Sequence, residues 1–113
     1  LYAHYDGQPV DPSQWVSDPW RPQLRGPRGD TLALDAPGRP DPEARLFGRS
    51  TSDDKGPIVA VLGALRALRA AGARPSVNVR LFLEGEEEVG SPHLRAVLEA
   101  HRATLAGADA WLF

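Results

Sequence analysis

The chain has 113 residues, 42% of them hydrophobic and 25% charged, a composition typical of a globular protein with at most one small domain. Its formal net charge of −2 lacks the positive excess that binds nucleic acid or an anionic membrane surface. It has no cysteine, so disulfides and thiolate metal sites are excluded. No apolar run approaches the roughly 18 residues of a membrane span, and no signal sequence begins the chain. We therefore expect a cytoplasmic protein that binds neither nucleic acid nor membrane.

The first half of the chain contains short strands separated by long loops. Residues 1–5 predict a strand, and residues 6–23 predict an ordered loop with four prolines and two tryptophans. Residues 24–45 are rich in Gly, Pro, Asp and Arg around the apolar patch "TLAL", which is either a hairpin strand or a surface insertion. The stretch "RLFGR" then predicts another short strand.

The second half alternates helix and strand. A helix is predicted from Pro57 to Gly72, since proline suits a first turn and glycine suits a helix end. Residues 76–84 alternate and then become continuously apolar, as a strand covered on both faces does. A second helix is predicted from Ser91, as its N-cap, to Gly107, and a last strand in residues 108–113. The apolar stripes of the two helices are Ile58, Val61, Leu62, Leu65 and Leu68, and then Leu94, Val97, Leu98 and Leu105.

This alternation predicts an α/β fold, a sheet flanked by helices. Three clusters of metal-capable side chains lie at element ends: "AHYDG" after the first strand, "STSDDKG" before the first helix, and "EGEEEVG" after the central strand. Ligand sites in open α/β sheets lie beyond the carboxyl ends of the strands. We therefore expect the clusters to converge.

The first two clusters each have an alternative interpretation. Two residues apart on a strand, His4 and Asp6 share a face, and a ligating imidazole is commonly oriented by such a carboxylate. The alternative is a histidine that is only hydrogen-bonded to its neighbour. For Asp53 and Asp54, the alternative is simple capping of the helix, although a cap needs only one aspartate.

The third cluster contains Glu86, Glu87 and Glu88, and its alternative is a solvated acidic turn. One carboxylate as metal ligand and its neighbour as general base is the arrangement that metal-assisted hydrolysis requires. Neither His93, in a first helical turn, nor His101, beside the apolar stripe, is expected to serve a site.

Together, "HYDGQPVDP", "LFGRSTSDDKGP" and "VRLFLEGEEEVGSP" resemble the amino-terminal catalytic half of the co-catalytic zinc peptidases. That family includes carnosinase-like dipeptidases, glutamate carboxypeptidase, aminoacylase and succinyl-diaminopimelate desuccinylase. The resemblance covers nearly the whole chain in the family's order and is nearest to the dipeptidase branch. It implies that His4 binds one metal ion, that Asp53 bridges two and that Glu88 binds the other. It also implies Glu87 as the general base and Asp6 as the residue that orients His4.

The resemblance has further implications for the backbone and for the extent of the domain. It implies that the Asp53–Asp54 peptide bond is often cis. Ser50 stands where the family usually has glycine, which leaves the backbone angle of that turn open. The family draws another acidic ligand from just past a strand like "ADAWLF" and a histidine from far downstream. We interpret residues 1–113 as a partial catalytic, metal-binding domain that lacks these ligands and the dimerisation domain.

The predicted function is therefore a fragment of a metal-dependent, dipeptidase-like hydrolase. It would cleave a peptide or amide bond near a free carboxylate by metal-activated water, with two divalent ions, zinc or else manganese or cobalt. The implied substrate is a small peptide or acylated amino acid, the complete protein is expected to be a homodimer, and the fragment alone is expected to be inactive. The alternative is a degenerate scaffold or cation-binding domain of the same fold. Glu87 beside Glu88 favours the enzyme, because a pure binding site needs no base.

Overall fold

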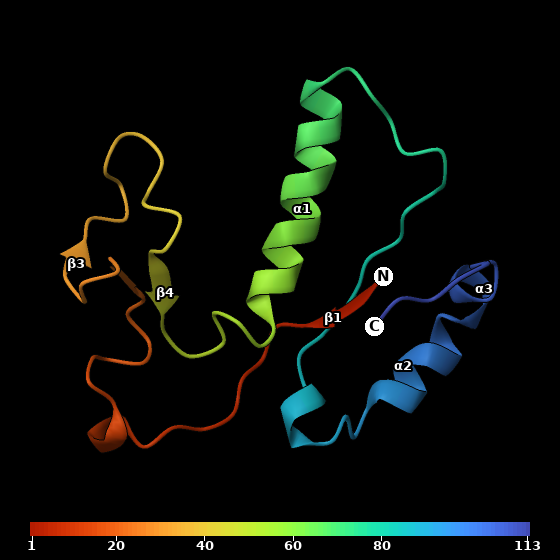
Figure 1. Ribbon diagram of the computed structural model, residues 1–113. Coiled ribbons are helices and arrows are strands. Elements are labelled where there is room, and N and C mark those ends of the chain that lie inside the picture. The colour runs from red at the N-terminus through yellow and green to blue at the C-terminus, as the bar shows by residue number, and fades with distance from the viewer.

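The computed structural model describes all residues, 1–113, as a mixed α/β arrangement of two small sheets and three α-helices (Figure 1). The predicted α/β class is confirmed. In chain order the elements are β1 (Tyr2–His4), η1 (Pro12–Gln14), β2 (Gln23–Arg25), β3 (Thr31–Leu32), β4 (Arg45–Phe47), α1 (Lys55–Ala70), β5 (Phe82–Glu84), η2 (Glu87–Val89), α2 (Leu94–Ala100) and α3 (Arg102–Leu105), where η marks a 3-10 helix.

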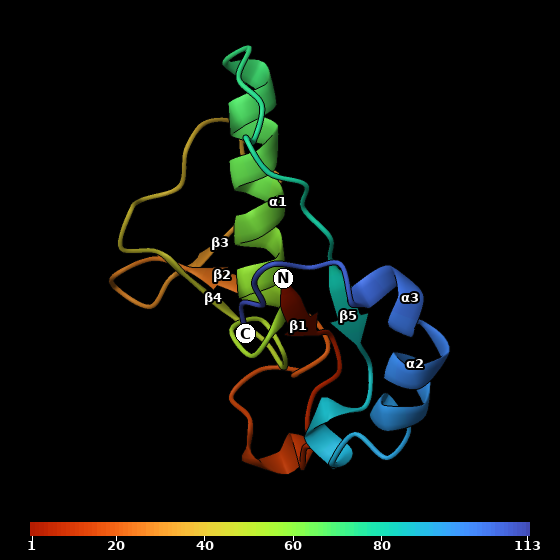
Figure 2. The ribbon, with the colours of Figure 1, turned by 90° about the vertical axis from the view of Figure 1, so that its right-hand side faces the viewer.

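β1 and β5 form a parallel ladder between residues 2–4 and residues 82–84. Tyr2 is opposite Phe82 and His4 is opposite Glu84, so both strands point their carboxyl ends the same way. Figure 2 shows the two strands side by side, with α2 and α3 beyond β5. On its other edge, β1 donates one backbone hydrogen bond, from the Tyr2 N–H to the Leu112 carbonyl at 2.8 Å. The strand predicted in residues 108–113 is therefore wrong, because a single bond does not make a ladder.

The strand predicted over residues 76–84 is much shorter than expected and forms only at its last three residues. Its only partner, β1, is itself three residues long, so residues 76–81 have no strand beside them to satisfy a ladder. Leu81 and Leu83 are 41% and 45% exposed, so the prediction of a strand covered on both faces is also wrong.

α1 confirms the first predicted helix and begins two residues before Pro57. Its end is the predicted glycine stop. Gly72 has a φ of 71°, and the N–H groups of Gly72 and Ala73 donate to the carbonyls of Arg69 and Leu68. This pair of bonds is the Schellman motif, in which glycine supplies the left-handed residue. None of the helices combines the length and apolar character needed to cross a membrane.

The second predicted helix is split and starts later than expected. Gly90 and Ser91 both have positive φ angles, 86° and 52°, so they turn the chain and Ser91 is not an N-cap, which needs extended backbone. His93 occupies that position without a side-chain capping bond. His101, with φ −105° and ψ 14°, separates α2 from α3. His101 is exposed, so its place beside the apolar stripe, predicted from the helical period, does not make it a packing residue.

The second sheet is a hairpin with an added strand, in the order β3-β2-β4. β2 was not predicted, whereas β3 lies within "TLAL" and shows that this patch is a hairpin strand. β4 confirms the strand predicted in "RLFGR", and the Arg25 guanidinium lies 4.4 Å from the centre of the Phe47 ring across the β2–β4 pair. This sheet lies apart from the β1–β5 ladder (Figure 1).

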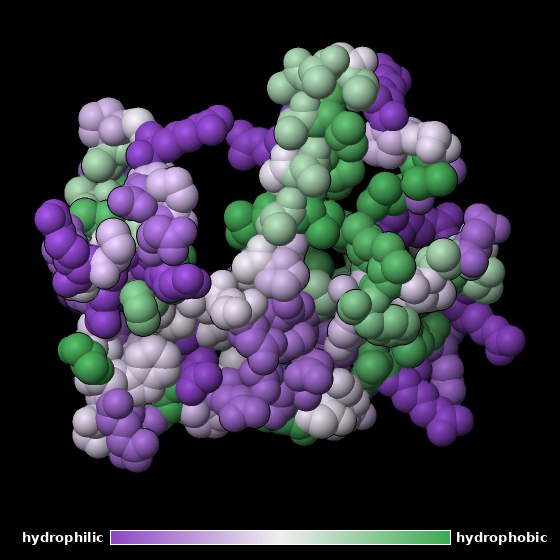
Figure 3. All heavy atoms as spheres, viewed as in Figure 1, coloured by the Kyte–Doolittle hydropathy of each residue, from purple (hydrophilic) through white to green (hydrophobic).

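The molecule is open and has no buried apolar core, although its composition is typical of a globular protein. Its radius of gyration is 17.6 Å, against about 13 Å for a compact chain of this length. Pro19 is the one apolar residue that is buried. Apolar side chains lie along α1 and around α2 on the surface (Figure 3). A groove of about 450 Å³ has only apolar lining residues, namely Tyr2, Phe82, Leu94, Leu98, Trp111 and Phe113.

The turn before α1 shows which backbone angle Ser50 adopts at the position where the family usually has glycine. Ser50 is buried, has a φ of 61°, and its carbonyl accepts the Lys55 N–H at 3.2 Å. The position therefore keeps the left-handed backbone that glycine adopts freely, although a serine occupies it. A Cβ added at Gly7 would collide with the Ser50 hydroxyl, so the two turns pack without room for a second side chain.

We expect Ser50→Gly to raise the free energy of unfolding by roughly 0.5–1 kcal/mol, because it removes a left-handed non-glycine residue. Ser50→Ala is the control. It keeps the Cβ and removes a hydroxyl that forms no hydrogen bond in the structure, so it should change stability little. Chemical denaturation of the three proteins measures this. A loss of stability in Ser50→Gly would show that the side chain, and not the backbone angle, matters at this turn.

Candidate metal centre

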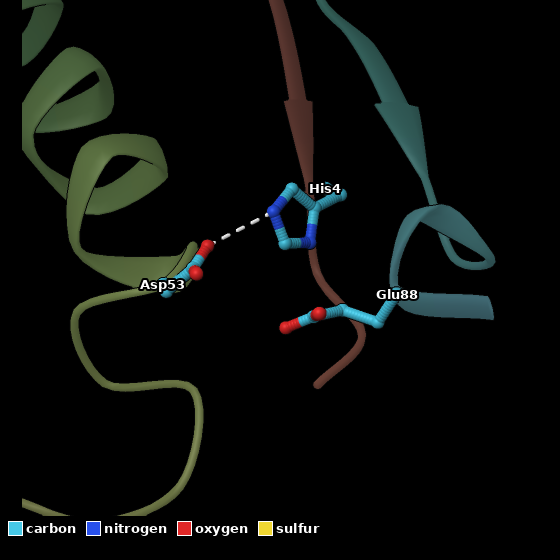
Figure 4. A group of neighbouring side chains, drawn as sticks. All are labelled: His4, Asp53 and Glu88. Atoms are coloured by element: carbon cyan, nitrogen blue, oxygen red, sulfur yellow. Dashed lines mark ion pairs between the residues drawn. The ribbon is translucent and has the colours of Figure 1, made fainter. Parts of the chain in front are cut away.

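Three predicted ligands meet where three separate elements begin or end. His4 is the last residue of β1, Asp53 precedes α1, and Glu88 lies in η2 just after β5 (Figure 4). One potential ligand atom from each lies within 4.8 Å of the other two. The carboxyl ends of the parallel β1–β5 pair and the turn before α1 bring them together. The predicted convergence of the three clusters is therefore present in the fold.

The His4 ring lies between carboxylates at both of its nitrogens. Nδ1 is 3.3 Å from an Asp6 oxygen, while Nε2 is 3.0 Å from Asp53 Oδ1 and 3.8 Å from Glu87 Oε2. His4 is buried, whereas Asp53 is exposed. A metal ligand at Nε2 requires the tautomer in which Nδ1–H donates to a neighbour, and the position of Asp6 beside Nδ1 suits that tautomer.

Asp6 connects two of the candidate ligands and not only one. Besides its contact with His4, its Oδ2 accepts the Glu88 backbone N–H at 3.0 Å. Burial tends to raise the pKa of the Asp6 carboxyl, but the bonds from the Glu88 N–H and His4 outweigh it and lower the pKa. Asp6 therefore holds η2 against the end of β1, a contact across 82 residues that no sequence pattern signals.

The site carries negative charge that no lysine or arginine neutralises. No ion pair joins any Lys or Arg to Asp6, Asp53, Asp54, Glu87 or Glu88. Burial tends to lower the pKa of His4, but the carboxylates, Glu87 foremost among them, raise it above the ordinary value. The same field stabilises any cation near Nε2, because Coulomb attraction does not distinguish a proton from a metal ion.

The donor set fits a divalent metal. One imidazole nitrogen and two carboxylates are ligands that zinc accepts without thiolate. The 3.0 Å between His4 Nε2 and Asp53 Oδ1 is close to the separation of two ligands on one tetrahedral zinc ion, about 3.3 Å for bonds near 2.05 Å. The second oxygen of Asp53 has no hydrogen-bond partner in the structure, so it remains available.

The four glutamates of "LEGEEE" have different partners. Glu84 is 7% exposed and turns to Tyr2, whose hydroxyl donates to it at 2.6 Å. Glu86 pairs with the exposed His93, whose Nδ1 lies 2.8 Å from Oε2. Only Glu87 and Glu88 face His4. Sequence reasoning treated the run as one acidic cluster, whereas the fold divides it among three contacts.

Asp54 has a role that sequence reasoning missed. The capping alternative does not hold, because Asp54 forms no side-chain bond to the first turn of α1. Its Oδ2 instead accepts the His4 backbone N–H at 3.2 Å. The peptide bond between Asp53 and Asp54 is cis, as the family resemblance implied. Lys55, the next residue, is exposed and forms no ion pair with either aspartate.

The fold and site thus define a mixed α/β domain that gathers nitrogen and oxygen ligands at the carboxyl ends of parallel strands. The profile of Peptidase family M20/M25/M40 matches residues 1–111, and the chain belongs to this family. The zinc-peptidase resemblance drawn from the three motifs is confirmed.

Curated relatives agree with this assignment. The chain is 34% identical over 101 residues to the Cys-Gly metallodipeptidase dug1 of Schizosaccharomyces pombe, covering 88% of this chain and 18% of that protein. It is 31% identical over 103 residues to the human Beta-Ala-His dipeptidase, covering 90% and 17%. It is 32% identical over 111 residues to the succinyl-diaminopimelate desuccinylase of Xylella fastidiosa, covering 96% and 25%. The chain thus spans under a fifth of the two dipeptidases.

The Tyr2–Glu84 contact next to the site generates a stability prediction. Glu84 Oε1 is buried without a partner, so the Tyr2 hydroxyl is the only side-chain donor to this carboxyl group. Tyr2→Phe should lower the free energy of unfolding by about 2–3 kcal/mol, because it leaves a buried polar group with no hydrogen bond.

Tyr5→Phe is the matched control for this prediction. The Tyr5 side chain is 53% exposed and its hydroxyl forms no hydrogen bond in the structure, so its loss should cost under about 0.5 kcal/mol. Urea denaturation of both variants decides the matter. Equal losses in the two proteins would contradict the special role of the buried pair.

Proposed function

We propose that the complete protein is a metal-dependent hydrolase of dipeptidase type that cleaves one amide bond near a free carboxylate. The observation that supports this most directly is the convergence of His4, Asp53 and Glu88, with Glu87 beside them. The relatives named as dipeptidases are similar over about nine-tenths of the chain. We further propose two divalent ions, zinc before manganese or cobalt, since one oxygen of Asp53 is directed at His4 and the other is available to bridge.

We assign each residue of the site a role in metal binding, orientation or proton transfer according to its position. His4 and Glu88 would hold one ion each and Asp53 would hold both, while Asp6 would orient the His4 ring and the η2 backbone. Bound divalent ions lower the pKa of water and polarise the substrate carbonyl. The Glu87 side chain is 44% exposed, so it can take a proton from water and later deliver it to the leaving amine nitrogen.

Glu87 distinguishes this proposal from the alternative function, a scaffold that binds a cation without turnover. Glu87 is not a member of the group whose ligand atoms converge, which consists of His4, Asp53 and Glu88. Its carboxylate nevertheless lies 3.8 Å from His4 Nε2, at the edge of the same site. A homodimer with small peptides or acylated amino acids as substrates completes the proposal.

Metal removal and a substrate panel test the function. The complete protein, treated with chelator and dialysed, should hydrolyse neither Cys-Gly nor β-Ala-His, and zinc, manganese or cobalt should restore cleavage of at least one. N-succinyl-diaminopimelate tests the deacylase alternative in the same assay. Metal binding without turnover of any of these compounds would favour the scaffold.

The two neighbouring glutamates should respond differently to the same substitution. Glu87→Gln removes the proton acceptor and leaves every proposed ligand, so metal content should stay near wild type while kcat falls by roughly 10²–10⁴-fold. Glu88→Gln weakens a ligand, so metal occupancy should fall and excess zinc should restore part of the activity. Metal analysis and steady-state kinetics measure both effects. Metal loss in Glu87→Gln together with full activity in Glu88→Gln would reverse the assignment.

A further inference from the structure

Two consecutive aspartates hold one histidine at two different points. Asp53 Oδ1 lies 3.0 Å from the His4 ring at Nε2, and Asp54 Oδ2 accepts the His4 backbone N–H at 3.2 Å. The ring contact belongs to the metal centre described above. The backbone contact has no role in that centre, yet it acts on the same residue.

The ordinary explanations for a second aspartate do not apply to Asp54. It forms no capping bond to the first turn of α1 and no ion pair with a lysine or arginine. It is also not a member of the group of side chains whose ligand atoms converge, which consists of His4, Asp53 and Glu88. Its one hydrogen bond is the bond to the backbone of β1.

That bond has a particular place among the contacts of β1. The β5 side of β1 is held by the parallel ladder and by the Tyr5 N–H, which donates to the Glu84 carbonyl at 2.9 Å. On the side of α1, the bond to Asp54 is the only hydrogen bond that joins β1 to the helix or to the turn before it. Without it, the distance from His4 to Asp53 depends on side-chain contacts alone.

We propose that Asp54 is a positioning residue of the metal centre. Its carboxylate holds the end of β1 against the start of α1, so that His4 Nε2 and Asp53 Oδ1 stay within reach of one ion. A ligand held in place before the ion arrives loses less conformational freedom on binding, so affinity is higher. This inference rests on the proposed function for the identity of the ligands and adds a residue that supports them.

The test measures the affinity of the complete protein for Zn²⁺ by competition with a chromophoric chelator. Asp54→Ala removes the acceptor and should weaken zinc binding roughly 10–100-fold, the usual effect of losing a residue that orients a ligand. Asp54→Asn keeps an amide oxygen that can accept the same N–H, so it should restore affinity to within a few-fold of wild type. The absorption spectrum of the Co²⁺-loaded protein should change in Asp54→Ala and not in Asp54→Asn.

Asp41→Ala is the matched control. Asp41 lies in an exposed loop and its carboxylate accepts the Glu43 N–H at 2.8 Å, so the substitution removes the same charge and the same kind of bond away from the site. Zinc affinity should not change in this variant. A loss equal to that of Asp54→Ala would show that net charge causes the effect and would overturn the proposal.

Other outcomes distinguish failure of this inference from failure of the proposed function. If Asp54→Ala lowers the melting temperature but binds zinc like wild type, Asp54 is structural and the inference is wrong. If Asp54→Asn is as weak as Asp54→Ala, the charge or direct ligation matters and the inference is again wrong. His4→Ala and Asp53→Ala report on the site itself. Wild-type zinc binding in both would overturn the proposed ligands, and with them this inference.

Discussion

A histidine ring surrounded by carboxylates is the interaction on which the site depends. His4 has Asp6 at one ring nitrogen and Asp53 and Glu87 at the other, and no lysine or arginine shares the cluster. Such an arrangement is stable only with a positive charge among the oxygens, because like charges at short range repel strongly. Against the lowering effect of burial, the same carboxylates, Glu87 foremost among them, raise the pKa of His4.

The backbone around His4 makes that arrangement possible. β1 is three residues long and lies between β5 and the segment that contains Leu112, so its position is set by residues from the far end of the sequence. Asp6 and Asp54 then fasten it to η2 and to the start of α1 through backbone N–H groups. Two carboxylates outside the group of convergent ligand atoms thus hydrogen-bond to main chain beside it.

The glutamates at the end of β5 and after it contact different residues, which reduces the repulsion between their charges. Burial of Glu84 is accompanied by the Tyr2 hydroxyl, and Glu86 pairs with His93 on the surface. The remaining two glutamates meet the same histidine. Glu84, Glu86 and Glu87 therefore each have a partner for their charge. The Glu88 carboxylate forms no hydrogen bond or ion pair and lies within 4.8 Å of the ligand atoms of His4 and Asp53.

The sequence by itself determined the class of fold, the first helix with its glycine stop and the three motifs of the metal centre. These depend on local patterns, namely hydrophobic period, turn chemistry and the spacing of ligand types, which act over a few residues. The length of β5, the missing strand at residues 108–113 and the split of the second helix were decided only by the tertiary structure. Strand length depends on the partner available, and that partner lies about 80 residues away in the chain. For the same reason no sign in the sequence pointed to the bonds that the Glu88 and His4 N–H groups donate to Asp6 and Asp54, since a hydrogen bond across the fold leaves no local pattern.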